Sequence, residues 1–156
     1  MNNEAFMRRA IALAQEGMDG GRGGPFGAVV VQAGRIVGEG CNRVTSTCDP
    51  TAHAEVVAIR AACTALGRFD LRGCEVYTSC EPCPMCLSAL YWARVDRVFF
   101  ANDRAAAARI GFDDALIYRE VGLPREARSL PLIPMLETEA RPVFDAWLRK
   151  PDRVGY

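Results

Sequence analysis

The first quarter of the chain passes from a helical hydrophobic pattern to an extended one. From Asn3 to Met18 apolar side chains recur at helical spacing, which predicts an amphipathic helix. The glycine-rich stretch 20–24 ends that helix. Two apolar segments follow, separated by Ala33-Gly34, and they predict a β-hairpin of strands 26–31 and 35–40 that turns at Gly34.

Beyond a polar loop at 45–51, helical and extended patterns alternate. The predicted elements are a helix at 53–66, a strand at 75–79, a helix at 84–94, a strand at 97–101, a helix at 104–110, an edge strand at 130–136 and a helix at 143–149. The segment 130–136 is assigned to an edge because its prolines cannot donate to a central ladder. This order predicts an α/β fold in which a central mixed sheet lies between two helical layers.

Composition is that of one globular domain, which we take to span residues 1–156. Half of the residues are hydrophobic and 24% are charged. Nineteen basic residues balance nineteen acidic ones, and Lys150 is the only lysine, so no basic patch for nucleic acid is predicted. No apolar run is long enough to cross a bilayer, and Glu4 interrupts any signal-peptide pattern. We expect a cytoplasmic protein.

Cysteine spacing indicates a metal site. The chain has seven cysteines, an odd number that does not suit a disulfide scaffold, and three of them crowd into Cys80-Glu-Pro-Cys83-Pro-Met-Cys86. Cys83 and Cys86 are three residues apart at the start of a predicted helix, so they share one face. His53, the only histidine, starts another predicted helix. Two thiolates and one imidazole suit Zn²⁺ and leave a fourth position for water.

Glu55 lies two residues after His53, beside a ligand set that is already sufficient, and we assign it to proton transfer. His-x-Glu followed by Pro-Cys-x-x-Cys is the known signature of zinc-dependent nucleobase deaminases. The alternative is a structural zinc site closed by Cys80 as a fourth ligand. Pro82 argues against it, because it extends the preceding residue and carries Cys80 away from the helix turn.

Longer motifs resemble one branch of these enzymes. The motifs are Gly24-Pro-Phe-Gly-Ala-Val, Asp49-Pro-Thr-Ala-His-Ala-Glu-Val, Tyr77-Thr-Ser-Cys-Glu-Pro-Cys-Pro-Met-Cys, Tyr91-Trp-Ala-Arg and Gly111-Phe-Asp-Asp. They are similar to those of bacterial guanine deaminases of the cytidine deaminase-like fold. The resemblance runs from near the N-terminus to Tyr156, and the Gly-Phe-Asp-Asp motif and this tail are the parts that discriminate guanine.

The resemblance implies a purine site and a shared tail. It implies one zinc ion per chain, hydrolysis of guanine to xanthine and ammonia, and catalytic roles for Glu55 and Asp114. It implies that the base is contacted by Phe26, Asn42, Ala54, Asp114 and Tyr156. It also implies a homodimer in which the C-terminal segment from about residue 142 is exchanged and Tyr156 closes the partner's site.

Several alternatives stay open at this point. A tRNA adenosine deaminase or a free-base cytosine deaminase would carry the same zinc motifs, and a structural zinc module is a third possibility. Asn42 could be only a turn residue, and Asp113-Asp114 only a helix cap or a solvated loop. The last residues could fray, as chain termini usually do.

Overall fold

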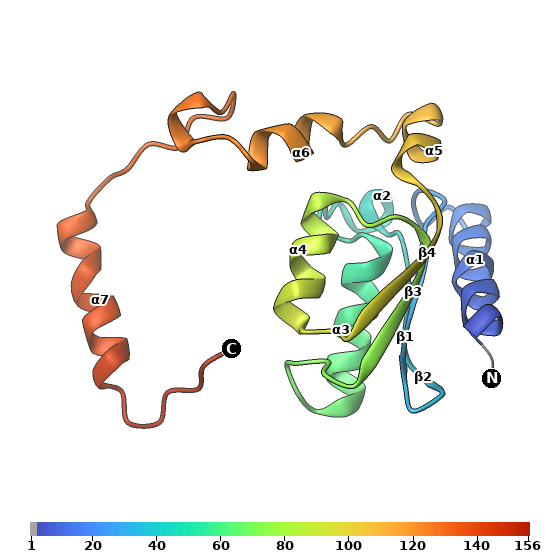
Figure 1. Cartoon of the computed structure of the whole chain (residues 1–156), viewed down its shortest axis with the longest axis horizontal. Helices are drawn as coiled ribbons and strands as arrows, with labels where there is room; N and C mark the ends of the chain where they lie inside the picture. Colours follow the sequence, from blue (N-terminus) through green and yellow to red (C-terminus); the bar gives the residue numbers. More distant parts are fainter. Residues whose placement is uncertain (1–2) are drawn as a thin grey trace. The chain divides into compact units, whose positions relative to one another are not determined.

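A computed structural model describes residues 3–156 (Figure 1), and its internal contacts divide the chain into two units, Met1–Asp114 and Ala115–Tyr156. The first unit contains α1 (Asn3–Asp19), β1 (Gly27–Gln32), β2 (Arg35–Cys41), α2 (Val44–Thr47), α3 (Ala54–Leu66), β3 (Cys74–Cys80), α4 (Pro84–Ala93), β4 (Arg97–Asn102) and α5 (Arg104–Arg109). Apart from the short α2, these are the predicted elements, and their bounds agree to within one residue.

The first unit is a three-layer sandwich, as predicted. Its sheet has the order β2-β1-β3-β4 and is mixed, because β1 pairs antiparallel with β2 and β3 while β3 and β4 run parallel. Helix α1 covers one face, and α3 and α4 cover the other (Figure 1). Each face has its own apolar cluster, with Phe6 and Tyr77 on the α1 side and Val30 and Ala58 on the α3 side.

The hairpin turns where predicted. Ala33 and Gly34 both have positive φ angles, 48° and 74°, as the two central residues of a type I′ turn require. This turn carries the right-handed twist of the flanking strands, so β1 and β2 continue as one antiparallel pair.

Helix α1 buries a narrower stripe than its sequence suggested. Phe6, Ala10, Leu13 and Ala14 are buried, but Ile11 is 47% exposed. The apolar pattern of the sequence also includes Ile11, yet at 100° per residue it is rotated by about 140° from Phe6 and faces away from the sheet.

The backbone of helix α3 lies in close contact with the backbone of strand β2. A Cβ atom on Gly38 would lie 2.5 Å from the Ala58 carbonyl oxygen, and one on Gly40 would lie 2.3 Å from that of Ala54. Ala54, Ala58 and Ala62 form the facing surface of α3 and are fully buried. Glycines on the strand and alanines on the helix are therefore what set the distance between these two layers.

The second unit departs from the prediction. It consists of α6 (Ala115–Val121), a 3₁₀ turn (Arg125–Ala127) and α7 (Glu137–Arg149). The edge strand predicted at 130–136 is wrong: residues 131–136 have no regular structure, and the sheet is built entirely from residues 27–102. Pro131 and Pro134 bring no N–H to a ladder.

Helix α7 begins six residues earlier than predicted. Pro142 lies inside it, although a proline usually marks a helix start. Glu137 and Glu139 in the first turn favour the positive end of the helix, and Arg141 pairs with Glu137 at 2.8 Å. Four large apolar side chains of this helix are exposed: Val143, Phe144, Trp147 and Leu148. Within residues 3–156, no helix is both long and apolar enough to span a membrane.

The close contact between α3 and β2 predicts a large effect of one methyl group. Gly40→Ala should lower the free energy of unfolding by about 1–3 kcal/mol or more, because the new Cβ meets helix backbone that cannot move aside. Chemical denaturation measures the change. Gly122→Ala is the matched control, since its Cβ would lie 3.6 Å from the nearest atom. Equal stability of the two variants would contradict this packing.

Candidate metal centre and active site

The predicted metal ligands lie where two helices begin. His53 is the N-cap of α3 and Cys83 is the N-cap of α4, and both have extended backbone angles. Neither uses its side chain to cap its own helix, so both side chains are available to a shared centre. Pro84 occupies the first turn of α4, where a missing N–H costs nothing.

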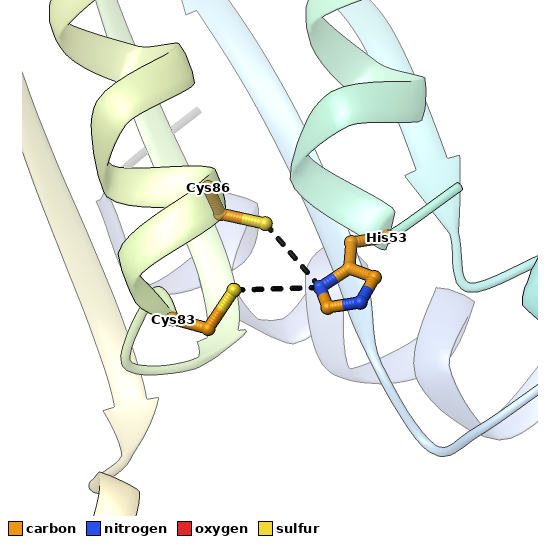
Figure 2. Close-up of side chains that lie close together, drawn as sticks. All are labelled: His53, Cys83 and Cys86. Atoms are coloured by element: carbon orange, nitrogen blue, oxygen red, sulfur yellow. Dashed lines mark hydrogen bonds between the residues drawn. The ribbon is translucent and has the colours of Figure 1, made fainter. Parts of the chain in front are cut away.

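The three side chains converge on one point (Figure 2). His53 Nδ1 lies 3.5 Å from Cys83 Sγ and 3.5 Å from Cys86 Sγ. All three ligand atoms lie within 4.8 Å of one another, and among residues 3–156 this is the group of histidine, cysteine and acidic side chains that could hold a metal ion. The sequence prediction of His53, Cys83 and Cys86 therefore agrees with their arrangement in the folded unit.

The electrostatics of the group favour a thiolate. The pKa of Cys83 falls to about 4, mainly because the Cys86 thiol donates a hydrogen bond to it, and His53 adds a second. The pKa of Cys86 is raised for the same reason, since it holds the shared proton, and burial adds to the effect. The hydrogen bond to Cys83 raises the pKa of His53. Such a proton-sharing group is ready to exchange its protons for a cation.

The donor set fits zinc with an open position. Two sulfur atoms and one imidazole nitrogen are ligands that Zn²⁺ prefers, and three protein ligands are typical of catalytic sites. Cys80 does not belong to the group. It is buried at the end of β3, its thiol lies 4.0 Å from the Asp103 carbonyl oxygen, and burial raises its pKa to about 11. A closed site with Cys80 as fourth ligand is not assembled here.

Glu55 is buried against this group. Its side chain is in the first turn of α3 and the residue is only 6% exposed. Thr78 on β3 donates a hydrogen bond to its Oε1 at 3.4 Å. Burial raises the pKa of the Glu55 carboxyl, and the nearby Cys86 thiol partly opposes this effect. A carboxyl that is desolvated beside a metal centre is suited to taking up and releasing a proton.

Asn42 and Phe26 are fixed near the ends of the hairpin strands. Asn42 is buried, and its Oδ1 accepts hydrogen bonds from the backbone N–H groups of Gly24, at 3.2 Å, and Val44, at 3.1 Å. These bonds fit the turn role that had been left open, and they leave the side-chain NH₂ to donate elsewhere. Phe26 accepts a bond from the Asn42 N–H through its backbone oxygen, at 3.0 Å.

Sequence reasoning missed Phe112. Its ring meets the Phe26 ring edge-on, with centroids 4.9 Å apart and planes at 88°. Phe112 belongs to the Gly-Phe-Asp-Asp motif, so the motif was the available signal, but the sequence gave no reason to pair residues 26 and 112. The two rings together form an aromatic wall in the first unit.

The remaining predicted site residues differ in their surroundings. Asp114 is close enough to Cys83 for that charge to contribute to the raised pKa of its carboxyl, although desolvation is the larger cause. Ala54 is 0% exposed and packs in the core between α3 and the sheet. Tyr156 belongs to the second unit and is exposed. The substrate contacts of all three stay predictions.

Comparison with known proteins identifies relatives of this arrangement. Residues 1–102 match the model of the cytidine and deoxycytidylate deaminase zinc-binding region. The guanine deaminase of Bacillus subtilis is 54% identical over 156 residues, which is 100% of both chains. The X-ray structure of the Bacillus subtilis enzyme gives a TM-score of 0.97 at 52% identity and covers 100% of this chain and 99% of that one.

Two further relatives bear on the substrate. The tRNA-specific adenosine deaminase of Aquifex aeolicus is 41% identical over 101 residues, which cover 65% of this chain and 66% of that protein. A solved structure in complex with 8-azaguanine is 35% identical, has a TM-score of 0.69, and covers 72% of this chain and 65% of the other.

The separation of Cys80 from the ligand group predicts metal contents that differ between two neighbouring cysteines. Cys83→Ser should lose zinc, because it removes one of three ligands, whereas Cys80→Ser should keep it. Elemental analysis of the purified variants measures the metal directly, and Cys48→Ser, an exposed cysteine, controls for the loss of any thiol. If Cys80→Ser lost as much zinc as Cys83→Ser, the three-ligand assignment would fail.

Proposed function

The chain belongs to the cytidine and deoxycytidylate deaminase family, and on that premise we propose that it hydrolyses guanine to xanthine and ammonia in a zinc-dependent reaction. The match that carries the choice of guanine is the one to the Bacillus subtilis guanine deaminase, because it is 54% identical and extends over both units of this chain. The site geometry supports the reaction type.

His53, Cys83 and Cys86 are the residues that would hold the zinc ion, one per chain. When bound, zinc supplies a Lewis acid that lowers the pKa of water. Glu55 would move both protons of the water: it accepts one from the attacking water and gives it to a ring nitrogen, then takes the second from the new C2 hydroxyl and passes it to the departing amine. A bond from C2 to oxygen forms and the bond from C2 to the amino nitrogen breaks, so guanine and water become xanthine and ammonia.

Thr78 supports this role of Glu55. Its hydroxyl donates a hydrogen bond to Oε1, which helps to hold the carboxyl in place. Because Glu55 is buried among side chains that contact it on several sides, its carboxyl keeps one orientation during proton transfer.

We assign the purine contacts to residues of the first unit, with the exchanged Tyr156 of a second copy closing the site. Phe26, backed edge-on by Phe112, offers a flat apolar face for the base. The free NH₂ of Asn42 can donate to an acceptor on the purine edge. Asp114, near Cys83, would contact the exocyclic amine. That a relative binds 8-azaguanine, a base with the guanine outline, supports a purine in this place.

A tRNA substrate is the main rival. The match to a tRNA-specific adenosine deaminase covers 65% of this chain, whereas the guanine deaminase match covers all of it. The chain also has no net charge and a single lysine, whereas binding of an RNA backbone favours an excess of positive charge. Free-base cytosine deamination would use the same metal chemistry and differs only in the pocket.

We propose a homodimer in which the C-terminal segment is exchanged. The apolar face of α7 is exposed in the second unit, and burying such side chains is worth roughly 1.5–3 kcal/mol each. A second copy of the chain can receive this face, and Tyr156 would then reach the partner's site. None of the seven cysteines forms a disulfide in the described structure, which fits a reducing compartment such as the cytoplasm.

The substrate assignment predicts ammonia release from guanine and not from the rival substrates. Zinc-loaded protein is incubated with guanine, cytosine, adenine, cytidine or a tRNA anticodon stem-loop, and ammonia is measured. Guanine should be the substrate that reacts. Glu55→Gln should lower kcat on guanine by about 10²–10⁴-fold, because the amide cannot shuttle a proton.

The control for this variant is its metal content. Glu55→Gln should retain zinc and still bind guanine, since Glu55 lies outside the ligand group. Turnover near the wild-type rate would reassign the general base. Activity on the tRNA stem-loop without activity on guanine would overturn the substrate assignment and leave the metal chemistry in place.

If the tail is exchanged as proposed, a deletion that spares α7 should abolish closure of the site without abolishing the dimer. Deleting residues 151–156 should leave folding, zinc and the dimer intact, because α7 remains, but should sharply lower guanine turnover. Tyr156→Ala should reproduce most of this loss. Light scattering measures the mass and the ammonia assay measures turnover. Full activity of the shortened chain, or an active monomer, would show that the tail has no part in the site.

A further inference from the structure

Glu81 joins the metal-binding loop to the segment that carries Asp114. Its backbone N–H donates to the Asn102 carbonyl at 2.7 Å, which extends the pairing of β3 with β4 by one residue. Its side-chain Oε2 accepts a hydrogen bond from the backbone N–H of Arg104, at 3.0 Å. Arg104 is the first residue of α5, and Glu81 stands two residues before Cys83.

The first turn of α5 contributes to holding this short helix in place. The helix is six residues long, and none of them is buried. Ala106, Ala107 and Ala108 are half-buried, so the helix packs only in part, and hydrogen bonds at its first turn help to set its place. Two of these come from outside the helical ladder: Glu81 binds the Arg104 N–H, and Asp103 Oδ1 caps the Ala106 N–H at 2.8 Å.

The end of α5 leads directly into the site. The N–H of Phe112 donates to the Ala107 carbonyl at 3.0 Å, and the Phe112 ring lies against Phe26. Asp114 follows two residues later, close to Cys83. Because Phe112 and Asp114 follow α5 closely in the chain, a shift of its first turn would also displace them.

We infer that Glu81 is a positioning residue for the deamination, which fixes α5 by its bond to the Arg104 N–H and thereby holds Asp114 beside the metal centre. This inference rests on the proposed function. Unlike the neighbouring Cys83 and Cys86, Glu81 would act through Asp114 and not through the metal.

Two pairs of variants test the bond from both ends. Glu81→Ala removes the acceptor, whereas Glu81→Gln keeps a carbonyl oxygen in its place. Arg104→Pro removes the donor N–H, whereas Arg104→Ala removes only the side chain. Proline is acceptable at a first helical position, and Asp103 before it has φ −80° and ψ 171°, angles that precede a proline readily.

The two disruptive variants should show the same loss. Glu81→Ala relative to Glu81→Gln, and Arg104→Pro relative to Arg104→Ala, should each lower kcat/KM for guanine by about 3- to 10-fold, the effect of one solvent-accessible hydrogen bond. Zinc content should equal that of the wild type in all four. The Arg104 pair keeps the test valid even if Glu81→Ala folds poorly.

The decisive measurement is a double-mutant cycle with Asp114. If Glu81 acts through Asp114, Glu81→Ala should cost less than twofold in kcat/KM when Asp114→Ala is already present. Independent, multiplied losses would overturn the inference, as would wild-type kcat/KM in both disruptive variants or a loss of zinc that accounts for the whole effect. A wild-type protein inert on guanine would instead refute the proposed function.

Discussion

The distance between α3 and β2 is the constraint on which the site depends. Gly38 and Gly40 have no side chains at the positions where Ala54 and Ala58 present only methyl groups on the helix, so the two backbones are in contact. This contact fixes the start of α3 relative to the sheet. His53 and Glu55 sit at that start, and a displacement of the helix would move both away from α4.

The same part of the fold places a carboxyl group beside soft sulfur atoms, and the two kinds of group are suited to different roles. The sulfur atoms of Cys83 and Cys86 and one nitrogen of His53 share protons that a cation would displace. Glu55 lies beside them but is held by Thr78 from β3. Because burial raises the pKa of its carboxyl, Glu55 is better suited to exchanging a proton than to remaining a permanent anion.

The region around Asn42 and Phe26, where we propose that the base binds, is shaped by close contacts of another kind. A Cβ on Gly23 would lie 2.2 Å from the Asn42 Oδ1, and one on Gly24 would lie 3.1 Å from both the Phe112 and the Phe26 rings. The glycine-rich stretch after α1 therefore does more than end a helix. It makes room for the Asn42 side chain and for the aromatic wall.

The sequence alone predicted the elements of the first unit and the candidate residues of its centre. Hydrophobic periodicity indicates helices and strands, and the spacing within residues 53–55 and 83–86 indicates candidate ligands and a candidate base, because both are local properties of the chain. The sequence-based prediction was wrong at residues 130–136, which have no strand to pair with. It also misplaced the start of α7, because this helix contains Pro142 in its interior. Only the tertiary structure paired Phe112 with Phe26 and linked Glu81 to Arg104. These contacts join residues 20 or more positions apart, and such distances are decided by how layers pack, which no local pattern encodes.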